Sequence, residues 1–171
     1  MNLFLWGALP YIAFTFLIVG TLVRFFYFER NWTTKSSEFL EKKQLRIANP
    51  LFHFGLLCVI GGHVVGVLVP KTWTAAMGIN DHMYHEGALY MGAVAGIIFI
   101  VGFLLLMKRR FTVPAMKVNT SGFDKWLYLF LTLAIFSGMA GTLLNASGFF
   151  DYRVSIGPWV RSLLSFMPDP S

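Results

Sequence analysis

Charged residues are scarce in this chain of 171 residues: only 13% are Asp, Glu, Lys or Arg, whereas 56% are hydrophobic. A soluble domain usually carries about 25% charged residues. So few charges cannot cover a fold in water, which excludes a soluble domain and favours membrane lipid as the solvent. Cysteine is scarce too. The single Cys58 lies within an apolar run, which excludes a disulfide framework.

What the sequence has in abundance is long apolar runs, at about residues 3–28, 51–69, 87–107 and 126–144. Each contains roughly 19 to 26 residues, and about 20 residues of helix are needed to cross the hydrocarbon core. A helix satisfies every backbone group internally, as lipid requires. We therefore predict an all-α integral membrane protein, one transmembrane domain over residues 1–171 with a bundle of about four transmembrane helices. Residues 1–6 contain no basic side chain, so we expect the first run to be retained and not cleaved as a signal peptide.

The basic residues predict how the chain is oriented in the membrane. Eleven of the 14 Lys and Arg side chains flank or fill two connections, residues 29–50 and 108–125. By the positive-inside rule both connections are cytoplasmic loops and the N-terminus is outside. This clustering explains the net charge of +6 without a nucleic-acid partner.

Two segments outside the runs are less clear. Residues 36–47 mix apolar and charged side chains, and either a short helix on the cytoplasmic face or a solvated linker fits them. After the fourth run, Pro158, Pro168 and Pro170 argue against a fifth full crossing by residues 147–171.

Two histidines, His53 and His63, lie within the second run. Imidazoles inside a membrane span are rare unless they face a partner, and neutral histidine is a common axial ligand of haem iron. The ten-residue separation corresponds to about 15 Å along a helix and an angle of some 80° around it. The two side chains therefore cannot share one iron, but each could ligate a separate haem. The alternative is that both are packed, hydrogen-bonded polar residues.

Four glycines accompany the histidines in the second run, and two uses of them are open. Gly55, Gly62 and Gly66, together with Gly61, could let the flat porphyrin approach the backbone. Alternatively they allow close packing of helices, which is the interpretation we prefer for the GxxxG pattern at Gly92 and Gly96.

A polar group, Asp81-His82-Met83-Tyr84-His85-Glu86, comes just before the third run, on the predicted outer side. It could be ordinary interfacial polarity or, with few ligands, a metal site. A third possibility is contact with a quinol, for which His85 or Glu86 would accept a proton near the membrane surface.

With these motifs in view, the chain resembles the membrane cytochrome b (gamma) subunit of respiratory nitrate reductase. The resemblance covers essentially the whole chain. It is carried by residues 10–13 (Pro-Tyr-Ile-Ala), 49–53 (Asn-Pro-Leu-Phe-His), 62–66 (Gly-His-Val-Val-Gly) and 105–110 (Leu-Leu-Met-Lys-Arg-Arg).

The resemblance implies a haem-carrying subunit in the bacterial cytoplasmic (inner) membrane. Such a subunit holds two haem b groups and oxidises menaquinol or ubiquinol at the outer face. It passes electrons to an iron-sulfur subunit and then to a molybdenum catalytic subunit that reduces nitrate in the cytoplasm. His53 would ligate the inner haem and His63 the outer haem. The quinol contact carries over only weakly, because Tyr84, His85 and Glu86 stand where the family can have a lysine.

The chain departs from the family in one respect. Family members have a fifth spanning helix with two more histidines, which supply the opposite axial ligands. None of the four histidines here lies beyond the fourth run, so we expect this chain to be truncated, with the opposite ligands outside it. The alternative is a shortened relative of the family, in which another chain would supply the opposite ligands or the haems would be lost. Two other functions remain as alternatives: a related cytochrome b anchor of another cytoplasmic reductase (sulfite or heterodisulfide type), and a haem-free membrane anchor.

Overall fold

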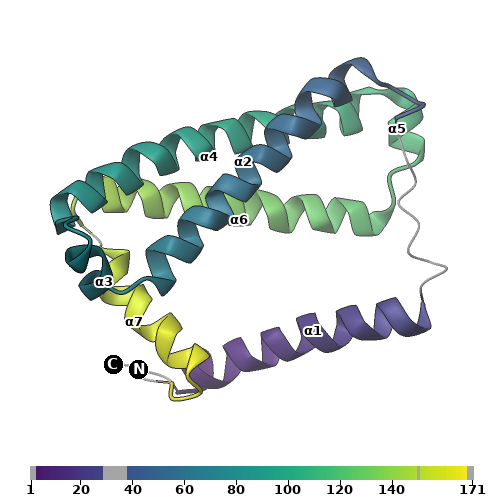
Figure 1. Ribbon diagram of the computed structural model, residues 1–171. Coiled ribbons are helices and arrows are strands. Elements are labelled where there is room, and N and C mark those ends of the chain that lie inside the picture. The colour runs from purple at the N-terminus through teal and green to yellow at the C-terminus, as the bar shows by residue number, and fades with distance from the viewer. Residues whose placement is uncertain (1–2, 29–37, 150, 169–171) are drawn as a thin grey trace. The chain divides into compact units, whose positions relative to one another are not determined.

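The computed structural model describes residues 3–28, 38–149 and 151–168. All regular structure in these ranges is helical (Figure 1). The elements are η1 (Phe4–Ala8), α1 (Leu9–Tyr27), α2 (Lys43–Leu68), α3 (Lys71–Ala76), α4 (Asp81–Thr112), α5 (Pro114–Val118), α6 (Gly122–Ala146) and α7 (Tyr152–Leu164). Four helices are long and apolar enough to cross a membrane: η1 with α1, then α2, α4 and α6. The predicted fold class, an all-α membrane protein with four spanning helices, is confirmed.

The chain divides into two compact units. The smaller unit lies within residues 1–36 and 158–171, and the larger unit within residues 37–157. In the smaller unit, the Tyr11 hydroxyl donates to the Leu163 carbonyl at 2.8 Å, and the Trp159 indole donates to the Trp6 carbonyl at 2.8 Å. Helix α7 begins in the larger unit and ends in the smaller one. Its 13 residues rise only about 20 Å, too short to cross the membrane, as expected for this segment.

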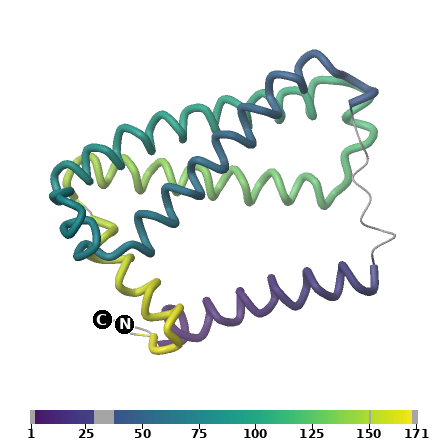
Figure 2. The backbone as a smooth tube through the Cα atoms, viewed as in Figure 1, coloured from purple at the N-terminus to yellow at the C-terminus, as the bar shows by residue number. Residues whose placement is uncertain are grey.

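The core of the larger unit is the contact between α2 and α4, which run in opposite directions and cross each other (Figures 1 and 2). Gly55 and Gly102 permit this contact, because a Cβ on Gly55 would lie 2.5 Å from the Phe99 nitrogen and one on Gly102 would overlap the Phe52 backbone. The rings of Phe52 and Phe99 pack beside these glycines, with their centroids 5.1 Å apart. Glycine therefore allows two helices to approach where any other residue would hold them apart.

At the end of the larger unit that carries the basic residues, ion pairs join the helices. The buried Arg109 donates from Nε to the Glu41 carboxylate at 2.8 Å and from Nη2 to the Glu41 carbonyl at 2.7 Å. Arg110 donates to Asp124 at 2.7 Å. Ser121 and Asp124 form a capping box that begins α6.

The helices extend further than the apolar runs from which they were predicted. The last eight residues of the predicted connection 29–50 are helical, because α2 begins at Lys43 and continues through Pro50. Residues 43–47 are thus the first turns of α2, neither a separate surface helix nor a linker, while residues 36 and 37 lie outside the described ranges. The predicted loop 108–125 is also largely helical, since α4 continues to Thr112, α5 follows, and α6 begins at Gly122. Hydropathy identifies the residues that match lipid, but backbone hydrogen bonds continue past them until a cap or turn ends the helix.

Candidate haem and quinol sites

The two histidines of α2 have the same local geometry. The Nδ1 atom of His53 lies 2.9 Å from the Asn49 carbonyl oxygen, and Nδ1 of His63 lies 2.7 Å from the Val59 carbonyl oxygen. A carbonyl can only accept a hydrogen bond, so in each ring Nδ1 carries the proton. The other ring nitrogen, Nε2, is then the one with a free lone pair. This tautomer, held by a hydrogen bond to a backbone carbonyl, is the form in which histidine binds a metal.

Both imidazoles are on the exposed surface of the helix. An exposed polar ring on a membrane-spanning helix is costly unless a ligand or another chain covers it. The ten residues between His53 and His63 correspond to about 15 Å of rise along an α-helix, so any group bound by each would be at a different depth. The donor atoms and their spacing therefore fit two separate metal-centred groups.

The glycines of α2 fall into two classes. Gly61 and Gly62 flank His63 on open surface, where an added Cβ would meet nothing within 4 Å in the described structure. Gly55 contacts the backbone of Phe99, and a Cβ on Gly66 would lie 3.0 Å from the Tyr152 ring. Gly62 therefore has room beside it for a flat ligand, whereas Gly55 and Gly66 are occupied by protein on that side.

His85 and Glu86 lie in the first turns of α4, at the end of the larger unit opposite the basic residues. His85 is half-buried and Glu86 is exposed. Glu86 lies 3.7 Å from Nε2 of His82, one turn earlier. The described ranges contain no group of three or more His, Cys, Asp or Glu side chains that could hold a metal ion.

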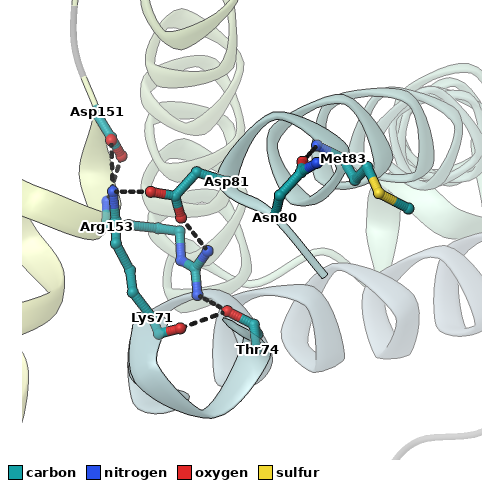
Figure 3. A network of polar contacts seen from close by, with 7 residues as sticks. All are labelled: Lys71, Thr74, Asn80, Asp81, Met83, Asp151 and Arg153. Atoms are coloured by element: carbon teal, nitrogen blue, oxygen red, sulfur yellow. Dashed lines mark hydrogen bonds and ion pairs between the residues drawn. The ribbon is translucent and has the colours of Figure 1, made fainter. Parts of the chain in front are cut away.

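Sequence reasoning missed a second polar group at this end, which we call the outer polar cluster: Lys71, Asp81, Asp151 and Arg153, with Thr74, Tyr84 and Tyr152 around them. Figure 3 shows Lys71, Asp81, Asp151 and Arg153 turned toward one another from α3, α4 and the start of α7. Lys71 Nζ lies 3.3 Å from Asp81 and 3.5 Å from Asp151. The one signal in the sequence that could have indicated the cluster is that acidic and basic residues occur together in the segments predicted to lie on the outer side of the membrane.

Arg153 is the centre of the outer polar cluster and is only 7% exposed. Its Nη2 donates to the Thr74 hydroxyl at 3.1 Å, and its Nη1 lies 3.6 Å from the Asp81 carboxylate. Its guanidinium carbon is 3.6 Å from the centre of the Tyr84 ring, a cation–π contact. Burial, the neighbouring Tyr84 and its hydrogen bond raise the pKa of Tyr152 to about 12, so this phenol is neutral at physiological pH.

Comparison with known proteins identifies the family. Residues 2–171 match the family described as the nitrate reductase gamma subunit. The chain is 45% identical over 168 residues to the nitrate reductase gamma chain of Bacillus subtilis, covering 98% of this chain and 75% of that one. It is 31% identical over 167 residues to the respiratory nitrate reductase 1 gamma chain of Escherichia coli, covering 97% of this chain and 74% of that one. The chain is also 39% identical over 166 residues to the nitrate reductase-like protein NarX of Mycobacterium tuberculosis. That match covers 95% of this chain and 26% of the relative.

The resemblance inferred from the motifs is thereby confirmed, since the match extends over nearly every residue and includes the histidine-bearing helix. The chain belongs to the nitrate reductase gamma subunit family, and it is the membrane cytochrome subunit of an oxidoreductase complex.

Proposed function

We propose that this chain carries two haem b groups, with His53 as an axial ligand of the inner one and His63 as an axial ligand of the outer one. The observation that carries the proposal is the shared tautomer: in both rings Nδ1 donates to a carbonyl one turn earlier, which leaves Nε2 free to ligate. When bound, the haems supply one-electron carriers at two depths between quinol and the iron-sulfur subunit.

Gly62 supports the outer site, because it offers bare backbone beside His63, and no described residue would lie within 4 Å of a Cβ added there. Gly55 and Gly66 act on the two proposed haem sites indirectly. They let α4 and Tyr152 approach α2 and so fix the helix that carries both ligands. Near the inner end, the backbone carbonyl of Asn49, one turn before His53 in α2, accepts the hydrogen bond from the His53 ring. The ligand is therefore held by helix backbone and not by a mobile loop.

At the outer end, we propose that menaquinol or ubiquinol binds beside the start of α4. Oxidation of a quinol to the quinone releases two electrons and two protons, so the site needs a proton acceptor near the surface. His85 and Glu86, in the first turns of α4, can each accept one. Glu86 is exposed, so a proton it takes can pass to water on that side.

At the inner end, the proposed partners are the iron-sulfur subunit and, beyond it, the molybdenum catalytic subunit. Lys108, Lys117 and Lys125 leave a positive surface around the helix ends there, because Arg109 and Arg110 are already paired with Glu41 and Asp124. A positive surface favours docking of an acidic partner face. The positive-inside rule puts this end in the cytoplasm of the bacterial inner membrane and the N-terminus outside.

The test is a reduced-minus-oxidised optical spectrum of the nitrate reductase complex in membranes, with His53→Ala and His63→Ala variants of the chain. Each variant should lose one of the two b-type signals and keep the other. His82→Ala is the matched control, since His82 is an exposed histidine paired with Glu86 outside α2, and it should keep both signals. If both α2 variants retained full haem content, the ligand assignment would be wrong and a haem-free anchor would become the better description.

A further inference from the structure

The outer polar cluster is electrically balanced but unevenly exposed. It holds two cations, Lys71 and Arg153, and two anions, Asp81 and Asp151. The Arg153 side chain is 6% exposed and that of Asp81 is 66% exposed. Among the described residues Nη1 of Arg153 has no hydrogen-bond partner and only the 3.6 Å ion pair with Asp81. Water screens exposed charges more than buried ones, so the field of Arg153 reaches further into the protein than that of its counterion.

The cluster is attached to the helix turn that carries His63. Tyr152, the neighbour of Arg153 in the chain, packs its ring on Gly66, with Cε2 3.0 Å from where a Cβ would be. Gly66 follows His63 by three residues, a rise of about 4.5 Å along the helix. Tyr152 also lies close enough to Tyr84 for the two phenols to interact, and the Tyr84 ring lies under the Arg153 guanidinium. A continuous set of contacts therefore joins Arg153 to the last turns of α2.

We propose that Arg153, together with its counterion Asp81, sets the midpoint potential of the haem on His63. The contact of Tyr152 with Gly66 holds the Arg153 charge near the turn of α2 that carries His63. The inference rests on the proposed function, in that it requires a haem at His63. It assigns Arg153 as a positioning and potential-setting residue, not as a ligand or a quinol contact.

The sign of the effect follows from electrostatics. Reduction lowers the positive charge of a haem by one, so a nearby cation favours the reduced form and raises the potential. Removing the charge of Arg153 leaves the cluster with one excess negative charge and should lower the outer potential. Neutralising Asp81 leaves one excess positive charge and should raise it. The inner haem on His53 is about 15 Å further along α2, so its potential should change far less.

The experiment is a spectroscopic redox titration of both b-type signals in the whole complex in membranes. The outer signal is defined as the one that His63→Ala removes. Arg153→Met should move the outer potential downward, Asp81→Asn should move it upward, and Arg153→Lys, which keeps the charge, should move it less than Arg153→Met. The control is Arg110→Met, which removes a partly buried, paired arginine at the other end of α4 and should leave the outer potential unchanged.

The outcomes separate this inference from the haem assignment. If His63→Ala kept both signals, the proposed function would fail and the titration would have no outer haem to report. If the outer signal depended on His63 but Arg153→Met and Asp81→Asn shifted it in the same direction or not at all, the inference would be refuted. Should Arg153→Met lose the outer haem altogether, Asp81→Asn still decides, because it keeps Arg153 with its Thr74 and Tyr84 contacts; an unchanged potential there refutes the inference.

Discussion

Replacement of Gly55 by alanine tests how α2 and α4 are held together, and it separates the packing glycines from the open ones. A Cβ at Gly55 would lie 2.5 Å from the nitrogen and 2.6 Å from the Cα of Phe99. These are backbone atoms, so a rotamer change cannot relieve the overlap. Ordinary contact needs about 3.5 Å, which means that the two helices must separate locally by roughly 1 Å.

The cost of that separation can be bounded. A gap of 0.5–1 Å forfeits about a quarter to a half of the attraction of each contact across it, and the Phe52–Phe99 packing lies directly beside Gly55. Overpacking of this kind costs about 1–3 kcal/mol. Alanine is also a better helix former than glycine by about 1 kcal/mol, which partly conceals the loss in a single variant.

A matched variant removes the helix-propensity term. Gly92 lies inside α4, and an added Cβ there meets no described residue within 4 Å, so Gly92→Ala gains helix propensity without overlap. Reversible unfolding of the purified chain in mixed detergent micelles should therefore show Gly55→Ala less stable than Gly92→Ala by about 1–3 kcal/mol. Equal stability of the two variants, or a more stable Gly55→Ala, would refute the close helix contact.

Three further predictions concern titration and quinol contact. A hydrogen bond from the Gln44 backbone amide, together with Arg109, lowers the pKa of Glu41 below 4.5 despite some desolvation. The ionised Glu41 should therefore stabilise the fold above that pH, and this stabilisation should be lost on acidification. In a plot of unfolding free energy against pH, Glu41→Gln should flatten the acid limb. Burial raises the pKa of Tyr152 to about 12, so its contribution should be complete below about pH 10 and lost as pH rises toward 12; a tyrosinate absorbance titration of Tyr152→Phe should lack the latest-titrating phenol. His85→Ala and Glu86→Gln should slow haem reduction by added quinol while reduction by dithionite stays complete, and unchanged quinol rates in both would remove these residues from the site.

The sequence by itself determined the fold class, and it was enough to select the two histidines proposed as haem ligands. Four apolar runs leave only spanning helices as a way to satisfy the backbone in lipid, and the described residues form four such helices. His53 and His63 could be selected because histidine within a span is rare and costly. The hydrogen bonds that set their tautomer come from carbonyls four residues earlier, so they follow from the helix itself.

The tertiary structure decided what one-dimensional patterns cannot contain. Gly55, Gly62 and Gly66 look alike in the sequence, but α4 fills the space beside Gly55, Tyr152 fills that beside Gly66, and Gly62 remains open. Arg153 meets Thr74, 79 positions earlier in the chain, only because the turn around α3 and the start of α7 come together. Helix ends were likewise set by caps and ion pairs and not by hydropathy. Hydropathy reports the preference of each residue for lipid, whereas contacts between distant residues depend on how whole helices pack.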